Sequence, residues 1–212
     1  MSFIQNIDNT VTSFIFNNWH GNNIVNQILG VFTRLGSGGV FWILFFSGIF
    51  IYHGLKEKRI SMFAIGGIIT LALGFVLNDF VFKKLFYNLL SFRDRPCQIG
   101  AGEVTADQIQ TWLTNTGLEI KTGGSFPSGH SFSSFNCAVY IMFYDKKFGW
   151  ITLPVALVIA FSRVFIGVHF MFDVIVGALL GVLFAIGMYY LTNFICKKLH
   201  VGEEGKSFYA IR

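Results

Sequence analysis

The sequence S-R-V-F-I-G-V-H-F-M-F-D, residues 162–173, places an arginine, a histidine and an aspartate between two long apolar runs. Ionisable side chains are costly at membrane depth and usually have a function there. If the chain is helical from Val168, His169 and Asp173 lie one turn apart on one face, so the carboxylate can hold one ring nitrogen and leave the other free. Together with Arg163, this pair indicates either chemistry on an anion such as phosphate or a buried structural salt bridge.

The composition around this segment is that of an integral membrane protein. Of the 212 residues, 53% are hydrophobic and 13% are charged, whereas soluble domains carry about 25% charged residues. The formal net charge is +5, but the positions of the basic residues are more informative than their sum. We expect a lipid bilayer as the environment and no nucleic acid as a partner.

The apolar runs predict an all-α, polytopic membrane bundle of five to six transmembrane helices. Ile24 to Leu35 is too short to cross a bilayer alone, so it is either a half-span or part of a bent first crossing. Three glycines in the second crossing, at 66, 67 and 74, predict close helix packing. The complete crossings are expected at residues 38–52, 60–82, 125–144, 148–165 and 168–196.

We expect residues 1–212 to form a single domain with two segments outside the bundle. Within the N-terminal segment 1–35, the apolar residues of Phe3 to Trp19 recur at helical spacing, which predicts an amphipathic helix in the membrane interface. The other segment is the polar outer-face loop 97–124. A capping box at Thr105-Ala106-Asp107-Gln108 starts a short helix there, whose apolar face is expected to rest on the membrane surface; this face carries Ile109, Trp112 and Leu113.

The basic residues predict the topology. One face of the alternating pattern collects most of the basic turns, and by the positive-inside rule this face is cytoplasmic. These turns contain Lys56, Lys58, Arg59, Lys146, Lys147, Lys197 and Lys198. The segments around Arg95, Pro127–His130 and Arg163–His169 then meet at the outer leaflet. The basic residues on that side call for an anionic partner.

The turn Pro127-Ser128-Gly129-His130 suggests a phosphate site. Proline at a helix start loses no useful hydrogen bond, glycine admits a ligand to the backbone, and the free amides with the helix dipole attract an anion. His130 beside these amides can donate a proton to a leaving oxygen. Taken alone, the turn also fits an ordinary helix cap with a surface histidine.

Three motifs, R-P at Arg95, P-S-G-H at Pro127 and S-R-x5-H-x3-D at Ser162, follow one another at intervals of about 30 residues on one predicted face. This combination resembles the type 2 phosphatidic acid phosphatase family, the integral membrane lipid phosphatases. The resemblance covers Lys83 to Asp173 by motif and the whole chain by its pattern of crossings.

The resemblance implies a role for each matching residue. His169 is the expected nucleophile that forms a phosphohistidine, and Asp173 fixes its tautomer. His130 protonates the leaving group and then activates water. The phosphate oxygens are bound by a set of four residues, namely Arg95, Ser128, Gly129 and Arg163. The resemblance implies no metal and no other cofactor.

The first motif departs from the family pattern, in which a lysine precedes R-P by six residues. Asn88 stands at the lysine's position, and Lys84 and Lys83 lie farther upstream by about one helical turn. Lys84 is the preferred substrate-binding candidate over Lys83, and Arg93 is an alternative source of the charge. The lysines also fit residues that merely extend to the membrane interface.

We therefore expect a metal-independent phosphatase acting on a membrane lipid phosphate or pyrophosphate at the outer leaflet. Candidate substrates are undecaprenyl pyrophosphate, phosphatidylglycerol phosphate, phosphatidic acid and lipid A. The alternative is a lipid phosphotransferase that passes the phosphoryl group to a lipid or sugar hydroxyl. A non-enzymatic lipid-binding or transport protein is disfavoured, because binding alone does not need both histidines and Asp173. The expected location is the bacterial cytoplasmic membrane, with the site facing the periplasm or exterior; the oligomeric state stays open.

Overall fold

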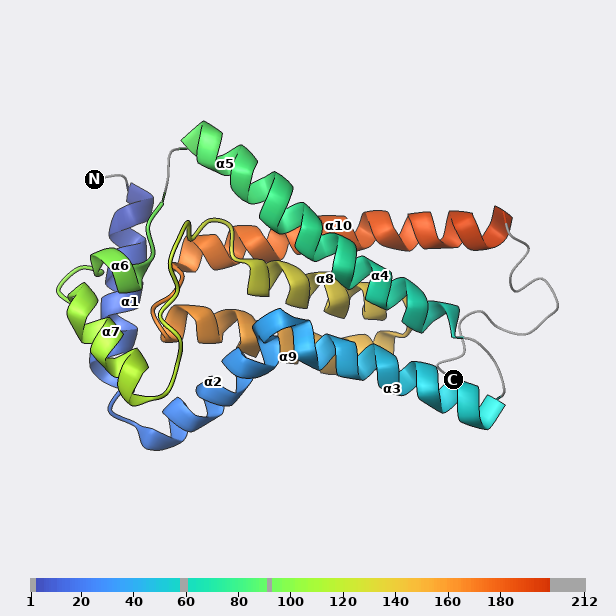
Figure 1. The fold of residues 1–212 in the computed structure, drawn as a ribbon, viewed down its shortest axis with the longest axis horizontal. Coiled ribbons are helices and arrows are strands. Elements are labelled where there is room, and N and C mark those ends of the chain that lie inside the picture. Colours follow the sequence, from blue (N-terminus) through green and yellow to red (C-terminus); the bar gives the residue numbers. More distant parts are fainter. Residues whose placement is uncertain (1–2, 58–60, 91–92, 199–212) are drawn as a thin grey trace.

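A computed structural model describes residues 3–57, 61–90 and 93–198. Within these ranges the chain forms helices and no strands, apart from one isolated bridge between Ala101 and Val104. The predicted all-α fold is confirmed (Figure 1). The helices are α1 (Phe3–Trp19), α2 (Asn23–Gly36), α3 (Val40–Glu57), α4 (Met62–Val76), α5 (Lys83–Leu90), α6 (Pro96–Ile99), α7 (Ala106–Asn115), α8 (Gly129–Tyr144), α9 (Lys146–Phe165) and α10 (Met171–Lys198).

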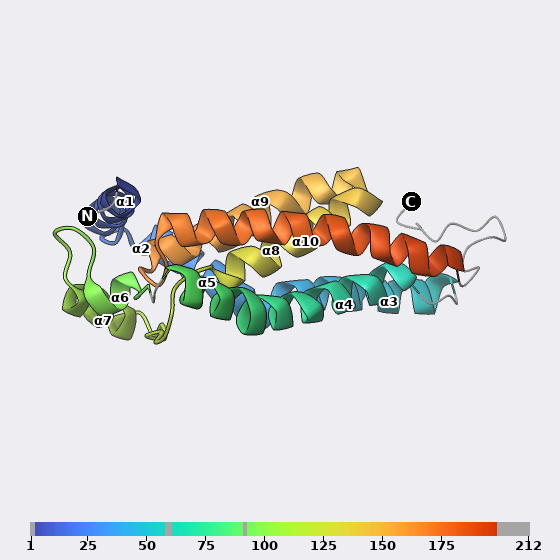
Figure 2. The same cartoon turned by 90° about the horizontal axis from the view of Figure 1, so that it is seen from above.

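The bundle consists of α3, α4, α8, α9 and α10, with α8 at its centre. Figure 2 shows α8 between the layer of α9 and α10 and the layer of α3 and α4. The described residues contain four stretches long and apolar enough to cross a membrane: Asn23–Lys56, Met62–Asn88, Lys146–Phe165 and Met171–Lys198. With 16 residues, α8 is shorter than these stretches, and its polar residues face inward.

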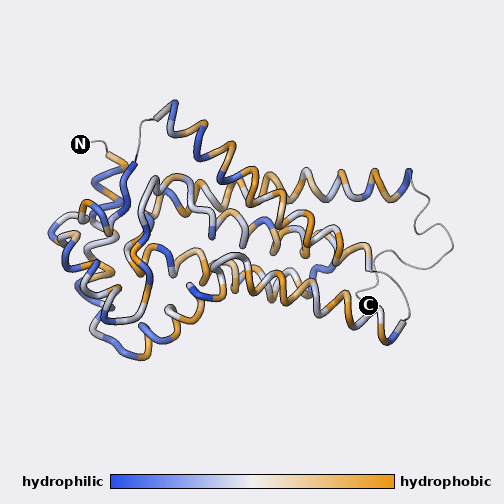
Figure 3. The backbone as a smooth tube through the Cα atoms, viewed as in Figure 1, coloured by the Kyte–Doolittle hydropathy of each residue, from blue (hydrophilic) through white to orange (hydrophobic). Residues whose placement is uncertain are grey.

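The distribution of side chains in the bundle is that of a membrane protein. Apolar residues follow the long helices, whereas hydrophilic residues concentrate at the end formed by α1, α6 and α7 (Figure 3). Large apolar side chains cover the outer surface, for example Leu44, Leu55, Trp150, Leu179 and Leu183. Small polar side chains of α8 are buried instead, namely Ser131, Ser133, Ser134 and Asn136. Lipid tails can cover the exposed apolar side chains, while the buried polar side chains of α8 need hydrogen-bond partners inside the protein.

The glycines of α4 allow the predicted close packing. A Cβ atom at Gly66 would lie 2.2 Å from the Tyr140 hydroxyl, and one at Gly67 would lie 2.1 Å from the Phe46 ring. At Gly74 it would lie 2.7 Å from the Asn136 amide nitrogen. The three positions therefore bring α4 against α3 and α8, and the expectation from the sequence is confirmed.

The first crossing is bent. α2 runs into α3 through the 3₁₀ turn Ser37–Gly39, where Gly38 and Gly39 have φ values of 60° and 68°. Only glycine adopts this left-handed backbone readily. Of the two interpretations of the short apolar segment, this continuous bent path from α2 into α3 favours the bent crossing.

The end of the bundle where α8 and α10 start is closed by α1, α6 and α7. Its anchor is His20, whose Nε2 lies 2.6 Å from the Phe165 carbonyl oxygen and whose ring stacks on Trp112 at 4.1 Å. Ile109 and Leu113 are fully buried in the protein core. The expectation that this face of α7 rests on the membrane surface is wrong, because α1 and the end of α9 bury it instead. The predicted capping box at Thr105 and Gln108 is present.

The alternating helix directions put the three motifs at one end of the bundle, as predicted. α8 and α10 start at this end and α9 finishes there, so the turns that carry Lys146 and Lys197 lie at the other end (Figure 1). Two basic residues of the topology argument, Lys58 and Arg59, lie outside the described residues.

Candidate active site

The turn between α9 and α10 presents His169 at the end of the bundle where α8 and α10 start. The expectation of a helix from Val168 is wrong, because α10 begins at Met171 and His169 lies in the turn before it. The amides of Val168 and His169 both donate to the Arg163 carbonyl oxygen at 3.2 Å. Gly167 makes the sharp reversal possible with a φ of 69°, and a Cβ atom there would lie 2.8 Å from Ile109. These local hydrogen bonds fix the backbone position of His169.

Asp173 lies beside this histidine on the first turn of α10. Its Oδ2 lies 3.6 Å from His169 Nδ1 and accepts a 2.9 Å hydrogen bond from the Phe170 amide. This distance is longer than that of a regular hydrogen bond. Both side chains are buried, so the charge of the carboxylate acts on the ring with little screening by water.

Arg95 contacts the other ring nitrogen. Its Nη1 lies 3.1 Å from His169 Nε2 and donates to the Val168 carbonyl at 2.9 Å. Its Nε and Nη2 donate to the carbonyls of Gly123 and Gly124 at 3.1 and 2.9 Å. A guanidinium only donates hydrogen bonds, so Nε2 holds a lone pair and the ring proton is on Nδ1, facing Asp173. This is the tautomer that a nucleophilic Nε2 requires.

The protonation state of His169 fits the same role. Burial lowers its pKa from the ordinary 6.5 to about 4; Asp173 opposes this effect and Arg95 adds to it. At neutral pH the imidazole is therefore uncharged and has a free lone pair. A histidine held only as the cation of a salt bridge would need a raised pKa instead, so the salt-bridge interpretation fits poorly.

The Pro127–His130 turn packs directly against the start of α10. The Ser128 amide donates to the Asp173 carbonyl oxygen at 3.0 Å, and a Cβ atom at Gly177 would lie 2.5 Å from the Ser128 carbonyl oxygen. As the N-cap of α8, Ser128 binds the amides of Ser131 and Phe132 through its hydroxyl and carbonyl. The amides of Gly129 and His130, in the first helical turn, are left available to a ligand.

His130 is the second residue of α8. Its Nε2 is buried and has no hydrogen-bond partner within the described part of the chain, and its ring lies next to Gly36 of α2. A buried polar atom without a partner is costly. A ligand at the site can supply that partner, which favours the functional interpretation of this turn over the ordinary helix cap.

Arg163 lies at the end of α9 and is almost fully buried. Its Nη1 donates to the Thr33 hydroxyl of α2 at 2.5 Å, while its Nε has no partner among the described residues. A desolvated cation with an unused donor is suited to binding an anion. Sequence reasoning missed Thr33, because nothing in its local pattern links it to a residue 130 positions away.

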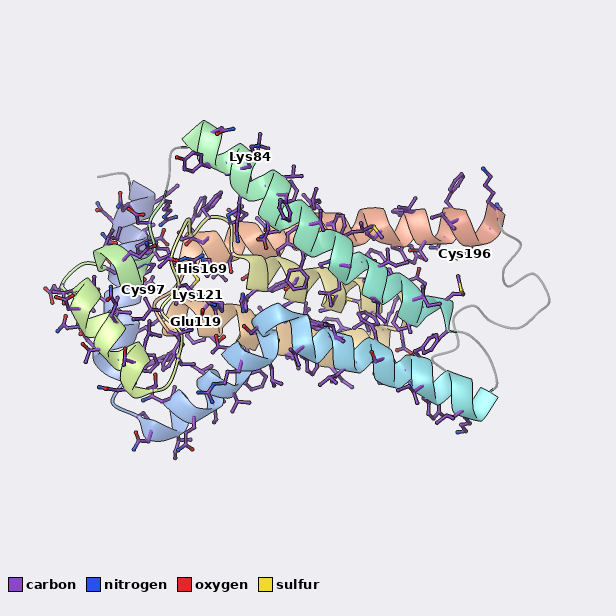
Figure 4. The ribbon with its side chains drawn as sticks, viewed as in Figure 1. Lys84, Cys97, Glu119, Lys121, His169 and Cys196 are labelled. Carbon is purple, nitrogen blue, oxygen red and sulfur yellow. The ribbon has the colours of Figure 1, made fainter. Side chains whose placement is uncertain are left out.

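The candidates for the missing first-motif charge lie apart from His169. Lys84 is exposed on α5 (Figure 4), and Lys83 pairs with Asp79 at 2.6 Å. Arg93 lies behind Asp173 instead, with Nη1 3.0 Å from Asp173 Oδ1. Asn88 is exposed. The structure thus brings Arg93 into contact with Asp173, whereas the two lysines line a neighbouring pocket.

These lysines line a pocket of about 640 Å³ beside the site. Two of its lining residues bind site residues, since the Gly124 carbonyl accepts from Arg95 and the Phe170 amide donates to Asp173. Its walls combine aromatic rings with three cations and two carboxylates; they include Lys83, Lys84, Arg93, Asp79, Asp94, Phe126, Phe170 and Phe172.

The loop of residues 97–124 adds a pair that the sequence did not single out. Lys121 pairs with Glu119, and Figure 4 shows both at the same end of the molecule as His169. The pKa of Glu119 is lowered, first by its hydrogen bond and ionic contact with Lys121 and to a smaller extent by Arg163. The loop therefore brings a further cation, Lys121, to the same end of the molecule as His169. Within the described residues, no three His, Cys, Asp or Glu side chains are grouped to hold a metal ion.

Comparison with known proteins agrees with this geometry. Residues 60–195 match the family profile described as the PAP2 superfamily. The chain is 40% identical over 90 residues to the bacitracin transport permease protein BcrC of Bacillus licheniformis, a match that covers 41% of this chain and 44% of that protein. It is 24% identical over 169 residues to the undecaprenyl-diphosphatase BcrC of Bacillus subtilis, covering 78% and 76% of the two chains.

A solved structure has the same fold. The transmembrane PAP2 type phosphatidylglycerolphosphate phosphatase of Bacillus subtilis superposes with a TM-score of 0.64 over 94% of this chain and 89% of that chain. The sequence identity is 21%, so this likeness concerns the fold alone.

Proposed function

The chain belongs to the PAP2 superfamily, and on that premise we propose that it is a phosphatase of membrane lipid phosphates with His169 as its nucleophile. The observation that carries this proposal is the contact between Arg95 and His169 Nε2 at 3.1 Å. It joins the expected nucleophile to a phosphate-binding cation and sets the tautomer for attack. The reaction proceeds in two steps through a phosphohistidine.

In the first step, the terminal phosphate of the substrate displaces Arg95 from the histidine lone pair. Arg95 then binds the phosphoryl oxygens with Arg163 and the free amides of Gly129 and His130. The Ser128 hydroxyl adds a hydrogen bond. Nε2 attacks phosphorus and the phosphorus–oxygen bond to the leaving group breaks. His130, which takes up a proton on Nε2 when the anionic substrate becomes the partner of that atom, gives this proton to the leaving oxygen.

In the second step, the now neutral His130 takes a proton from water. The resulting hydroxide attacks phosphorus, the phosphorus–nitrogen bond breaks, and inorganic phosphate leaves with His169 restored. Asp173 stabilises the positive charge that the ring carries between the two steps. This scheme assigns no role to a metal ion.

Undecaprenyl pyrophosphate is the substrate we favour. The Bacillus subtilis relative that aligns over most of this chain is an undecaprenyl-diphosphatase, and the pocket beside the site offers Lys84 and Lys83 as further cations. A pyrophosphate carries a second phosphate that these cations can bind, whereas a phosphomonoester does not. We propose Lys84 as the contact to this phosphate.

We also propose that the site faces the outer surface of a bacterial cytoplasmic membrane. The support is the concentration of lysines at the other end of the bundle, which the positive-inside rule assigns to the cytoplasm. An undecaprenyl pyrophosphate on the outer leaflet would then reach His169 without crossing the membrane.

The test is phosphate release by the purified protein in detergent from a panel of lipids. The panel contains undecaprenyl pyrophosphate, phosphatidylglycerol phosphate, phosphatidic acid and lipid A, each assayed with wild type and His169→Ala. We expect wild type to release phosphate from undecaprenyl pyrophosphate and His169→Ala to release none. Labelled phosphate appearing on an added lipid or sugar alcohol instead of in solution would favour the phosphotransferase.

A further inference from the structure

A chain of contacts between charged side chains connects the N-terminal helix to the Asp173 carboxylate beside His169. Asp8 of α1 pairs through Oδ2 with Nη2 of Arg93. The other terminal nitrogen of Arg93, Nη1, lies 3.0 Å from Asp173 Oδ1, and Asp173 Oδ2 faces the histidine at 3.6 Å. The guanidinium also lies over the Phe170 ring, 4.5 Å from its centre. Arg93 is therefore held between two carboxylates and one aromatic face.

Asp8 lies on the buried face of α1, although it is a charged residue. It is 1% exposed, while Ile4, Ile7 and Phe14 of the same helix are exposed. A buried carboxylate is stable only when it is paired and hydrogen-bonded. Asp8 has both kinds of partner, because its Oδ1 accepts a 3.0 Å hydrogen bond from the Phe172 amide in the first turn of α10. This single side chain fixes Arg93 and the helix that carries Asp173.

The charges of this chain matter for the reaction. One guanidinium between two carboxylates leaves a net charge of −1 behind the imidazole. Without Asp8, the positive charge of Arg93 would cancel Asp173 alone, and the free guanidinium would be drawn toward the phosphate. The ring carries a positive charge only while it bears phosphate, so a net negative group behind it stabilises that state selectively.

We propose that Asp8 is a positioning residue of the active site, which acts through Arg93 to hold the Asp173 carboxylate toward His169. This inference depends on the proposed phosphohistidine chemistry. Asp8 lies outside the residues 60–195 that match the family profile, so the N-terminal helix completes the catalytic centre of this chain. The competing interpretation is that Asp8 only anchors α1 to the bundle.

The experiment compares Asp8→Asn with Asp107→Asn, the same change at an exposed residue in the first turn of α7. Asparagine keeps the size of Asp8 and removes its charge. We expect kcat on undecaprenyl pyrophosphate to fall by about tenfold or more, as for other groups that orient a histidine, with KM changed by less than about twofold. Asp107→Asn should match wild type. Binding of orthovanadate, read by vanadium NMR, should weaken in Asp8→Asn only.

A double variant separates positioning from anchoring. Because Asp8 acts through Arg93, we expect Asp8→Asn with Arg93→Gln to lose no more kcat than Arg93→Gln alone. Folded Asp8→Asn protein with wild-type kcat and vanadate affinity, or additive losses in the double variant, would overturn the inference. If Asp8→Asn does not fold, the Arg93→Gln variant tests the inference instead. A wild-type kcat in Arg93→Gln would overturn it, because Asp8 is proposed to act through Arg93. A wild type that releases phosphate from no lipid and binds no vanadate would instead refute the proposed function.

Discussion

Arg95 Nη1 lies 3.1 Å from His169 Nε2. The cation expected to bind phosphate therefore donates a hydrogen bond to the nitrogen expected to attack phosphorus. The two residues come from segments 74 positions apart, and the carbonyls of Gly123 and Gly124 hold the guanidinium in place. The free site is therefore arranged around a position that a phosphate can enter by replacing one contact with several.

Replacing Arg95 by lysine tests this arrangement. Lysine keeps the positive charge but cannot make the same set of fixed hydrogen bonds. We expect kcat/KM for lipid phosphate to fall by about 100- to 1,000-fold, the usual effect of removing a donor from a transition-state site. The same substitution at the exposed Arg34 is the control and should have little effect. Unchanged activity of Arg95→Lys would show that the guanidinium does not bind the transferring phosphate.

The pH dependence of activity tests the state of His169. Its uncharged form is the nucleophile, and its pKa is lowered to about 4. Activity should therefore persist as the pH falls below 6.5 and be lost only as it passes through about 4. The measurement is kcat/KM against pH, which reports the groups of the free enzyme. A loss of activity near pH 6.5 would contradict this assignment if it persists when each of the other histidines is replaced.

Thr33→Val tests the support of Arg163 by α2. Valine has nearly the same shape but cannot accept the hydrogen bond from Arg163 Nη1. Leaving a buried charged donor without its partner costs about 1–3 kcal/mol, and we expect lower thermal stability together with about tenfold lower kcat/KM. Thr152→Val is the matched control, because the hydroxyl of this buried threonine donates to carbonyls of its own helix. Equal activities of Thr33→Val and Thr152→Val would show that Thr33 does not support the active site.

Gly177→Ala tests the contact between α8 and α10. The new Cβ atom would lie 2.5 Å from the Ser128 carbonyl oxygen, so the Pro127–His130 turn must shift. We expect loss of both stability and phosphate release. Gly187→Ala on the same helix has open space around its Cβ and should be neutral or stabilising by about 0.5–1 kcal/mol. A fully active Gly177→Ala enzyme would mean that the position of this turn is not critical.

Much of the site could be predicted from the sequence because its main residues sit in local patterns. The spacing of His169 and Asp173 predicts that the two side chains lie close together, and they do, although His169 lies in the turn before α10 and only Asp173 lies on the helix. The alternation of apolar crossings then puts the segments of Arg95 and His130 at the same end. These inferences need only helix periodicity and the length of a membrane span.

The supporting contacts could not be predicted in this way. Asp8 and Thr33 reach residues 85 and 130 positions away, and no local pattern distinguishes them from other polar residues of amphipathic helices. The face of Ile109 and Trp112 shows a related difficulty, because its apolarity indicates burial but not whether protein or lipid buries it. The displaced lysine of the first motif belongs here too, since Lys84 lines a neighbouring pocket rather than reaching His169.

The central claim, that His169 attacks a lipid phosphate, is tested most directly by phosphate release from undecaprenyl pyrophosphate in detergent. Wild type and His169→Ala are compared at equal amounts of folded protein, with rapid quenching in base to trap phosphate on histidine. We predict phosphate release and a base-stable phosphate on residue 169 in wild type, and neither in the variant. Equal rates of phosphate release by the two proteins would contradict the account.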